Sequence, residues 1–382
     1  MKLRPSWAAR LAFLVVGPFA EHFFSARVAT MRSSNALQPE RVHSASIAFN
    51  VISTIAAANL TGAYKFGGCA TVGERIFFAP DDQDVVGVLD TANEDGMMTI
   101  GTSEAGVRGP SKYRGAVAVG KRVFFCPWDM DNIGVVDTES ATFSTIDTSA
   151  AGVTGPSKYR GAAAVDTMVA FAPSDQDNVG LLDTATGAFS TVSTLAMGVS
   201  GPAKYRGAAA VGPRIYFAPH MQNDTGVYDV ASRTFSTIPT GLAGAAHFDG
   251  AVSVGSRVFF APYNAGALGV LDTGTNAFTM VAMSGLAGPY AYSGAAAVGG
   301  LVVLAPYAEN RTVAYNTASG AFVDIATSHV GVVGPYKYQG AAAVGRRVFF
   351  APFSQDTVGF VDTSQHAAAR TEARRVQASE SR

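Results

Sequence analysis

Apolar residues along this chain occur in short runs separated by glycine, proline, aspartate and asparagine. Residues 161–192 show the pattern in four runs, at 161–165, 169–172, 179–183 and 188–192. Each run is too short for a helix, alternates or is rich in β-branched residues, and is bounded by residues that favour turns. The pattern therefore predicts four consecutive β-strands, named A to D below, joined by tight turns.

This group of four strands recurs seven times, at intervals of 43 to 47 residues. Such a period, built from four short strands, is typical of a β-propeller blade. Each unit begins at a glycine, namely Gly68, Gly115, Gly161, Gly207, Gly250, Gly294 or Gly340. Twelve residues later the chain has proline in every unit, at Pro80, Pro127, Pro173, Pro219, Pro262, Pro306 and Pro352. The sequence predicts an all-β fold, a single seven-bladed β-propeller with four antiparallel strands per blade.

The two ends of the repeat region complete each other. The seventh unit stops after Asp362-Thr363 without a strand D, while residues 48–55, before the first unit, read like the strand D segment at 189–192. We expect this N-terminal segment to supply the outer strand of the seventh blade, because such closure leaves no long unpaired edge. The predicted propeller covers residues 46–364.

Residues 1–45 are interpreted as a targeting-like leader and linker, and residues 365–382 as a disordered polar tail. Lys2, Arg4 and Arg10 precede an apolar run at 11–20, which is too short to span a bilayer and suits the core of a signal peptide. The stretch 27–41 is rich in Arg and Ser, which favours an organellar transit peptide. Secretion or delivery to the endomembrane lumen is expected, with organellar import as the alternative.

Charge and cysteine content exclude some classes of partner. The chain has 28 basic and 29 acidic residues, so no net field directs it to nucleic acid or to an anionic membrane. No segment after the leader is long enough to span a membrane. Cys69 and Cys126 belong to different blades, so two buried free thiols are expected. We expect a monomer without a cofactor.

The segment from Val179 to Val192, Val-Gly-Leu-Leu-Asp-Thr-Ala-Thr-Gly-Ala-Phe-Ser-Thr-Val, resembles the C–D hairpin of YVTN-type β-propeller repeats. The resemblance extends over about residues 48–364. Kelch-like repeats are a weaker match, because their paired glycines are missing. Members of these repeat families include surface proteins, binding scaffolds, lactonases and lyases. The resemblance therefore implies the fold without choosing among these activities.

Antiparallel blades place the D–A and B–C loops on one face of the ring, here called the loop-rich face. Two residues before each unit glycine stands an aromatic residue, and in three units arginine follows it. One interpretation is that the rings wedge between neighbouring blades. The other is a ring of aromatic and cationic side chains that binds an anionic or carbohydrate ligand at the channel mouth. The binding candidates are Tyr113, Arg114, Tyr159, Arg160, Tyr205, Arg206 and Tyr338.

The repeat is interrupted between the fourth and fifth units. His220 follows Pro219 where an aromatic residue is common, and His247 and Asp249 replace Lys and Arg. Two histidines and a carboxylate can hold a metal or perform acid–base chemistry, although loop histidines are more often solvated. These three residues are the only catalytic candidates, and no metal site is predicted.

Aspartates in the B–C loops have a simpler explanation than metal binding. The segment 175–183 has acids at positions 1, 3 and 9 of a calcium loop, but Val179 replaces an oxygen donor. An extended strand would also carry Asp183 about 20 Å from Asp177. We interpret these aspartates as turn-forming residues.

On the opposite face, an arginine that opens strand B is expected to lie across from the aspartate that ends strand C. Arg75 with Asp90 and Arg347 with Asp362 are examples, and Met168 opposite Asp183 is the exception. Such cross-strand pairs contribute about 0.2–1 kcal/mol each. Their predicted role is structural.

These observations favour a non-catalytic binding or interaction scaffold whose loop-rich face takes an unknown protein, small molecule or carbohydrate. The alternative is a lactonase- or lyase-like enzyme centred on His220, His247 and Asp249. Three N-glycosylation sequons, at Asn59, Asn223 and Asn310, matter only if the chain is secreted.

Overall fold

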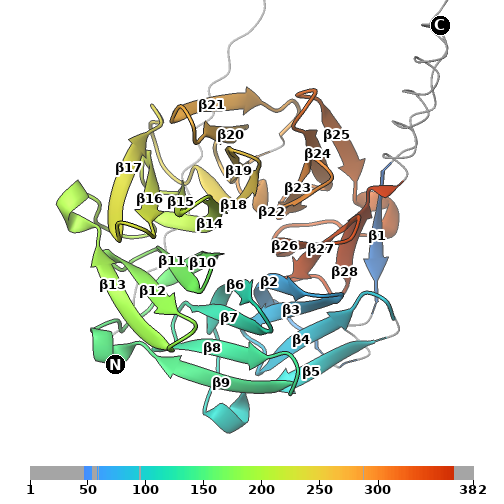
Figure 1. Ribbon diagram of the computed structural model, residues 1–382. Coiled ribbons are helices and arrows are strands. Elements are labelled where there is room, and N and C mark those ends of the chain that lie inside the picture. The colour runs from blue at the N-terminus through green and yellow to red at the C-terminus, as the bar shows by residue number, and fades with distance from the viewer. Residues whose placement is uncertain (1–46, 54–57, 59, 94–95, 287, 365–382) are drawn as a thin grey trace, which may run out of the picture. The chain divides into compact units, whose positions relative to one another are not determined.

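The computed structural model describes residues 47–53, 58, 60–93, 96–286 and 288–364. These residues form seven four-stranded antiparallel sheets arranged as a ring around one axis (Figure 1). The predicted all-β, seven-bladed propeller is thereby confirmed. The predicted leader, the polar tail and the sequon at Asn59 lie outside the described residues and stay predictions.

The strands of each blade follow one another from the axis outward, as Figure 1 shows. Blades 1 and 2 contain β2 (Phe66–Val72), β3 (Arg75–Pro80), β4 (Val85–Asp90), β5 (Met97–Gly101), β6 (Tyr113–Val119), β7 (Arg122–Pro127), β8 (Asn132–Asp137) and β9 (Thr142–Asp147). Blades 3 and 4 contain β10 (Tyr159–Val165), β11 (Met168–Pro173), β12 (Asn178–Asp183), β13 (Ala188–Ser193), β14 (Tyr205–Val211), β15 (Arg214–Pro219), β16 (Asp224–Asp229) and β17 (Thr234–Pro239).

Blades 5 and 6 contain β18 (Phe248–Val254), β19 (Arg257–Pro262), β20 (Ala267–Asp272), β21 (Ala277–Ala282), β22 (Tyr292–Val298), β23 (Leu301–Pro306), β24 (Arg311–Asn316) and β25 (Phe322–Ala326). Blade 7 contains β26 (Tyr338–Val344), β27 (Arg347–Pro352), β28 (Val358–Asp362) and, as its outer strand, β1 (Ala48–Ile52). Short 3₁₀ turns follow four of the outer strands: η1 (Ser103–Ala105), η2 (Ser149–Ala151), η3 (Leu195–Met197) and η4 (Ser328–Val330).

The N-terminal strand closes the ring as predicted. β1 pairs antiparallel with β28, so that Phe49 lies opposite Val361. The ring of Phe49 is fully buried and stacks on Phe350 with 5.8 Å between centroids. Both ends of the repeat region are therefore fixed in one sheet (Figure 1).

The seven unit glycines touch one another around the axis. A Cβ atom built on Gly207 would lie 2.5 Å from the Cα of Gly250, and the same contact at the other six glycines measures 2.5–2.8 Å. All seven also have φ in the left-handed region, between +82° and +148°. Only glycine satisfies both conditions, because it has no Cβ and accepts positive φ without strain.

A β-bulge accompanies each of these glycines. In blade 3, Tyr159 pairs with Pro173 and Ala162 with Phe171, so Arg160 and Gly161 lie opposite the single residue Ala172. The same shift occurs in all seven A–B strand pairs. Bulges reorient the side chain next to the extra residue. The residue before each glycine is thereby presented to the central channel.

The space between neighbouring blades holds the hydrophobic core. The tyrosine at the start of β10 is representative: Tyr159 is fully buried and packs with Phe124 and Val169 of blades 2 and 3. Its ring lies so close to strand C that a Cβ on Gly180 would approach the ring to 2.8 Å. Cys69 and Cys126 are free and buried, as predicted. Among the described residues no helix is long and apolar enough to cross a membrane.

Buried lysines connect neighbouring blades on the loop-rich face. Lys204 of blade 4 is buried, and its Nζ lies 3.0 Å from Asp177 in the B–C loop of blade 3. In the same loop Asp175 accepts a hydrogen bond of 2.8 Å from the backbone N–H of Ala203. The aspartates that mimic a calcium loop are therefore the acceptors of an inter-blade clamp. Equivalent ion pairs join Lys65 to Asp356, Lys112 to Asp84 and Lys158 to Asp131.

In the remaining blades the clamp departs from the Lys–Asp pair, with both partners replaced in two cases and only the acceptor replaced in the third. His247 faces Asn223, with 3.2 Å between Nε2 and Oδ1. Where Ala291 replaces the lysine, Gly266 stands at the acceptor position. Lys337 faces Asn310 at 3.4 Å. Burial lowers the pKa of Lys337 to about 8.

The opposite face differs in part from the sequence prediction. The register places Arg75 opposite Asp90 and Arg347 opposite Asp362, as expected. The ion pair forms in blade 4, where Arg214 lies 2.9 Å from Asp229. In other blades the guanidinium donates to a threonine carbonyl of the next blade. These bonds are Arg75 to Thr138, Arg122 to Thr184, Arg257 to Thr317 and Arg347 to Thr91.

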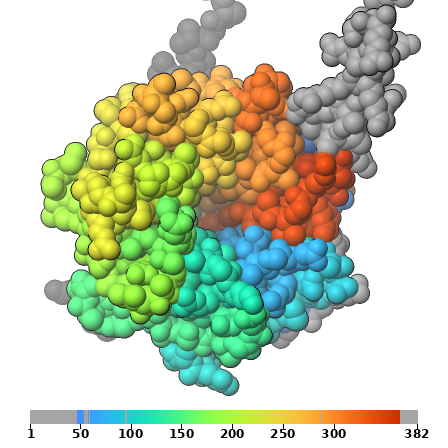
Figure 2. Space-filling model, viewed as in Figure 1, coloured from blue at the N-terminus to red at the C-terminus, as the bar shows by residue number. Residues whose placement is uncertain are grey.

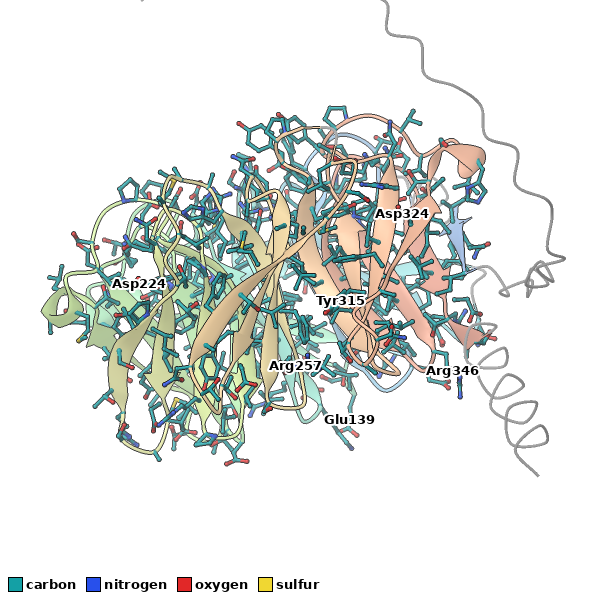
Figure 3. The ribbon with its side chains drawn as sticks, turned by 90° about the horizontal axis from the view of Figure 1, so that it is seen from above. Glu139, Asp224, Arg257, Tyr315, Asp324 and Arg346 are labelled. Atoms are coloured by element: carbon teal, nitrogen blue, oxygen red, sulfur yellow. The ribbon has the colours of Figure 1, made fainter. Side chains whose placement is uncertain are left out.

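An arginine side chain is long enough to span the gap between blades, and a carbonyl there needs a donor. The strand C aspartates meanwhile accept from backbone N–H groups of their own turns, such as the N–H of Ala92 on Asp90 at 3.0 Å. These arginines therefore connect neighbouring blades, and the predicted ion pair across the B–C hairpin of one blade is the less common contact. Figure 3 shows Arg257, Glu139 and Arg346 toward this same edge of the ring.

We predict that Gly207→Ala destabilises the propeller far more than Gly212→Ala does. Both glycines have positive φ, at +82° and +56°, but nothing lies within 4 Å of a Cβ at Gly212. Gly212→Ala, the control, should lower the free energy of unfolding by about 1 kcal/mol because its backbone conformation is strained. Gly207→Ala should lower it by about 2–4 kcal/mol, because the added methyl group also clashes with the neighbouring glycine. Urea unfolding of both variants measures the difference. Equal losses would contradict the close ring contact.

We predict that Asn310→Asp stabilises the protein at pH 7 by about 1–2 kcal/mol, because it adds a carboxylate at the clamp position of buried Lys337, in addition to nearby Glu309. A lysine whose folded pKa is lowered opposes folding below that pKa, and this cost disappears as the pH rises toward the unfolded value. The free energy of unfolding of Asn310→Asp should therefore exceed that of the wild type most clearly near neutral pH. Thermal unfolding at pH 7 is the measurement, with the surface variant Asn276→Asp as control. The same melting temperature in wild type and Asn310→Asp would contradict the clamp.

Candidate functional site

The residues that precede the ring glycines line the channel and differ from blade to blade. In chain order they are Gly67, Arg114, Arg160, Arg206, Asp249, Ser293 and Gln339. All except Arg206 line a cavity of about 150 Å³ at the glycine ring. Arg206 lines a second cavity, of about 420 Å³, toward the loop-rich face. A scaffold repeated seven times thus carries a polar lining that is not repeated.

Asp249 is the centre of a buried polar cluster that spans three blades. Its Oδ2 accepts a hydrogen bond of 2.5 Å from Nη2 of Arg160 and one of 3.0 Å from the hydroxyl of Ser293. The side chains of Arg160 and Asp249 are 9% and 5% exposed. Ion pairs shielded from water are stronger than surface pairs, so Arg160 is held firmly in the channel.

Arg206 is less completely paired than Arg160. Its Nη1 lies 3.8 Å from the same Oδ2 of Asp249, beyond hydrogen-bonding distance. Its Nε is buried, and no described residue accepts a hydrogen bond from it. The guanidinium lies 5.6 Å from the ring centroid of Tyr263, and it also donates a hydrogen bond to the hydroxyl of that tyrosine. Burial, followed by repulsion from Arg160, lowers the pKa of Arg206 to about 10, so the group stays charged at pH 7.

A second pair lies in blades 1 and 2. Asp81 follows Pro80, and its Oδ2 accepts from Nε of Arg114 at 2.9 Å. The guanidinium of Arg114 also lies over Trp128, 4.6 Å from the ring centroid. Oδ1 of Asp81 is buried without a partner among the described residues. Burial raises the pKa of Asp81 to about 6, although Arg114 acts against this shift.

The charges in this mouth do not cancel. Among the groups that face the channel itself, the guanidinium groups of Arg114, Arg160 and Arg206 exceed the carboxylates of Asp81 and Asp249 by one positive charge at pH 7. His220 adds none, because burial, followed by nearby Arg206, lowers its pKa to about 4. The mouth therefore attracts anions.

An aromatic arc lines the other half of the mouth. We define it as Tyr64, Tyr263, Tyr290, Tyr307, Tyr336 and Phe353, which come from blades 1 and 5 to 7 or the loops that lead into them. Five ring contacts connect its members, with centroid distances from 4.8 to 6.0 Å. His220 continues the arc, 5.3 Å from Tyr263. The arc, except for Phe353, lines the 420 Å³ cavity together with Arg206 and Asn264.

Four of the candidate residues lie elsewhere than the mouth. Tyr113, Tyr159, Tyr205 and Tyr338 have no exposed surface and pack between blades. The interpretation as inter-blade wedges therefore describes them, and they cannot contact a ligand in this structure. The reason is the bulge, which turns the tyrosine toward strand C and the following residue toward the channel. Arg114, Arg160 and Arg206 do face the channel, as the second interpretation required.

The two histidines and Asp249 do not form one site. His247 occupies the lysine position of the inter-blade clamp and contacts Asn223, while Asp249 contacts Arg160 and Ser293. His220 donates through Nδ1 to the carbonyl of Phe248 at 2.9 Å. Among the described residues no group of three or more His, Cys, Asp or Glu side chains could hold a metal ion. These three residues therefore do not form a metal-binding group, and an acid–base role for any of them stays a prediction.

Sequence reasoning did not identify Asp81, Asn264 or the aromatic arc. A signal was available in the alignment of the seven units. The residue after each unit proline varies, as Asp81, Trp128, Ser174, His220, Tyr263, Tyr307 and Phe353, although the residues just before it are nearly constant. Figure 2 shows the face of the ring hollowed near the axis, where the inner strands meet.

Comparison with known proteins supports the fold and leaves the activity open. No protein-family profile and no curated protein matches the sequence. Virginiamycin B lyase from Staphylococcus aureus superposes with a TM-score of 0.63 at 11% identity, over 83% of this chain and 99% of that one. The WD40 repeats of RRP9 give 0.60 at 12%, over 83% and 98%. The WD40 propeller of Doa1 gives 0.59 at 10%, over 83% and 98%. Such similarity shows a seven-bladed β-propeller, and kinship with YVTN-type or Kelch-like repeats stays a prediction.

Proposed function

We propose that the protein is a non-catalytic binding propeller that holds a small anionic molecule at the channel mouth of its loop-rich face. The incomplete pairing of Arg206, which shares the carboxylate of Asp249 with Arg160, carries this proposal. Its Nε is buried without a partner, and its nearest carboxylate is already bound by Arg160. Buried donors are almost always hydrogen-bonded in folded proteins. A carboxylate ligand would supply the acceptor and neutralise the charge.

The shape of the mouth supports the same proposal. A cavity of about 420 Å³ lies in the size range of small-molecule sites, and its lining is mostly aromatic with a few polar groups. Arg206 belongs to this cavity, so an anion paired with it would place the rest of the molecule against the tyrosines.

The alternative, a lactonase- or lyase-like enzyme, has one observation in its favour. Nδ1 of His220 carries the proton, because the carbonyl of Phe248 can only accept, and Nε2 therefore keeps a lone pair beside the cavity. A pKa of about 4 makes this nitrogen a weak base at neutral pH. His247 contacts Asn223 and not His220, and Asp249 is already bound by Arg160 and Ser293. Binding is the better supported function.

We predict that Arg206→Gln weakens the binding of benzoate, a simple aromatic carboxylate, at least tenfold. Glutamine keeps part of the length of the arginine side chain and removes the positive charge that the ligand would neutralise. Arg214→Gln, whose arginine is paired with Asp229 on the opposite face, should bind like the wild type. Isothermal titration of all three proteins at low ionic strength is the measurement, because salt screens the attraction. Equal affinities in the two variants would refute the proposed site.

We predict that benzoate affinity rises about fivefold as the pH falls from 7.5 to 5. Asp81, with its pKa raised to about 6, loses its negative charge over this range, and the net positive charge of the mouth increases. Arg114, Arg160, Lys112 and Asp82 are the charged groups that surround Asp81. His220 takes up a proton only near pH 4.

The matched variant for this pH dependence is Asp81→Asn. It removes the titrating carboxyl, so its affinity should be high and nearly constant from pH 7.5 to 5. The same titrations, repeated at four pH values, make the comparison. A wild-type affinity that stays flat or falls with acidification would contradict the assignment.

A further inference from the structure

The aromatic arc has a shape that selects among anionic ligands. Tyr64, Tyr290 and Tyr336 are 42%, 40% and 37% exposed, whereas Tyr307 and Phe353 behind them are buried. Neighbouring rings are tilted by 42° to 57° where an exposed tyrosine meets an inner ring. The rings therefore form a curved surface and not a slot between parallel planes.

A curved aromatic surface fits a puckered ring better than a flat one. A planar heterocycle or base stacks on a single ring face, whereas a saturated sugar ring offers C–H groups on both faces to several rings. The phenol hydroxyls add polar groups at the rim, since five of the six residues in the arc are tyrosines. A cationic ligand, the usual guest of an aromatic cage, is disfavoured by the guanidinium of Arg206 beside Tyr263.

Polar groups at the edge of the cavity match the hydroxyls of a sugar. Asn264 uses its Oδ1 to accept from the backbone N–H of Tyr290 at 2.9 Å, which leaves its amide N–H groups to donate. His220 offers the lone pair of Nε2 as an acceptor. Both residues line the cavity that contains Arg206. One hydrogen-bond donor, the amide of Asn264, and one acceptor, Nε2 of His220, therefore lie in the same cavity as the guanidinium of Arg206.

We propose that the ligand is an acidic saccharide, a pyranose that carries a carboxylate. Its carboxylate pairs with Arg206, its ring rests on Tyr263, Tyr290, Tyr307 and Tyr336, and its hydroxyls bond to Asn264 and His220. This inference rests on the proposed anion site and adds the chemical class of the ligand.

The test compares three probes by isothermal titration. D-glucuronate has both the sugar ring and the carboxylate, D-glucose lacks the carboxylate, and cyclohexanecarboxylate lacks the hydroxyls. Glucuronate should bind at least tenfold tighter than either of the other two. Arg206→Gln should reduce glucuronate binding to the level of glucose.

Two tyrosine variants test the ring contact without disturbing the fold. Tyr290→Ala and Tyr336→Ala act at exposed positions with left-handed φ, and Ala203 and Ala246 already occupy the same position in other units with φ of +50° and +57°. Each variant should weaken the binding of glucuronate at least fivefold. Met98→Ala, at an exposed residue of the outer strand β5, is the control and should bind normally.

The outcomes separate this inference from the proposed function. If glucuronate and cyclohexanecarboxylate bind equally and both need Arg206, the anion site stands and the saccharide is excluded. If glucose binds as tightly as glucuronate, the carboxylate is not recognised and the inference fails. If neither carboxylate responds to Arg206→Gln, the anion site itself is refuted.

Discussion

The contact between neighbouring glycines at the axis is the constraint on which the rest of this structure depends. Seven strands A meet there so closely that a single Cβ would lie 2.5–2.8 Å from the next backbone. The left-handed φ of these glycines produces a bulge, which sends the preceding aromatic side chain between the blades and the next side chain into the channel. One backbone feature thus packs the core and presents the channel lining. Pairing of β1 with β28 completes the seventh blade and so closes the ring.

Much of the architecture was predictable from the sequence because it repeats. The spacing of Gly161, Pro173 and Asp183 predicted the strands of blade 3, and the truncated seventh unit predicted that residues near Phe49 close the ring. The register of Arg75 opposite Asp90 also followed from the spacing. Repetition supports such inferences because every unit must satisfy the same backbone constraints.

The site was less predictable, because it depends on side-chain direction and on contacts between blades. Alternation along a strand would place Tyr159 and Gly161 on one side, and the bulge that changes this has no signature beyond the glycine. Arg75 was assigned to Asp90 across its hairpin, but a long side chain also reaches the next blade, where it donates to Thr138. His247 and Asp249 are close in sequence and diverge in space, because one joins the clamp and the other enters the channel.

The variation among blades follows two different rules, and the difference separates scaffold from site. At the clamp, partners differ together: Lys204 faces Asp177, His247 faces Asn223, and Ala291 stands where the acceptor is Gly266. A buried cation without a carboxylate is costly, so the clamp keeps its charges matched in most blades, and Lys337 facing Asn310 is the exception. At the mouth this matching is absent, since Asp249 serves both Arg160 and Arg206. Arg206 differs from the clamp cation Lys337 because it lines an open cavity, and we therefore propose that a ligand completes its pairing after folding.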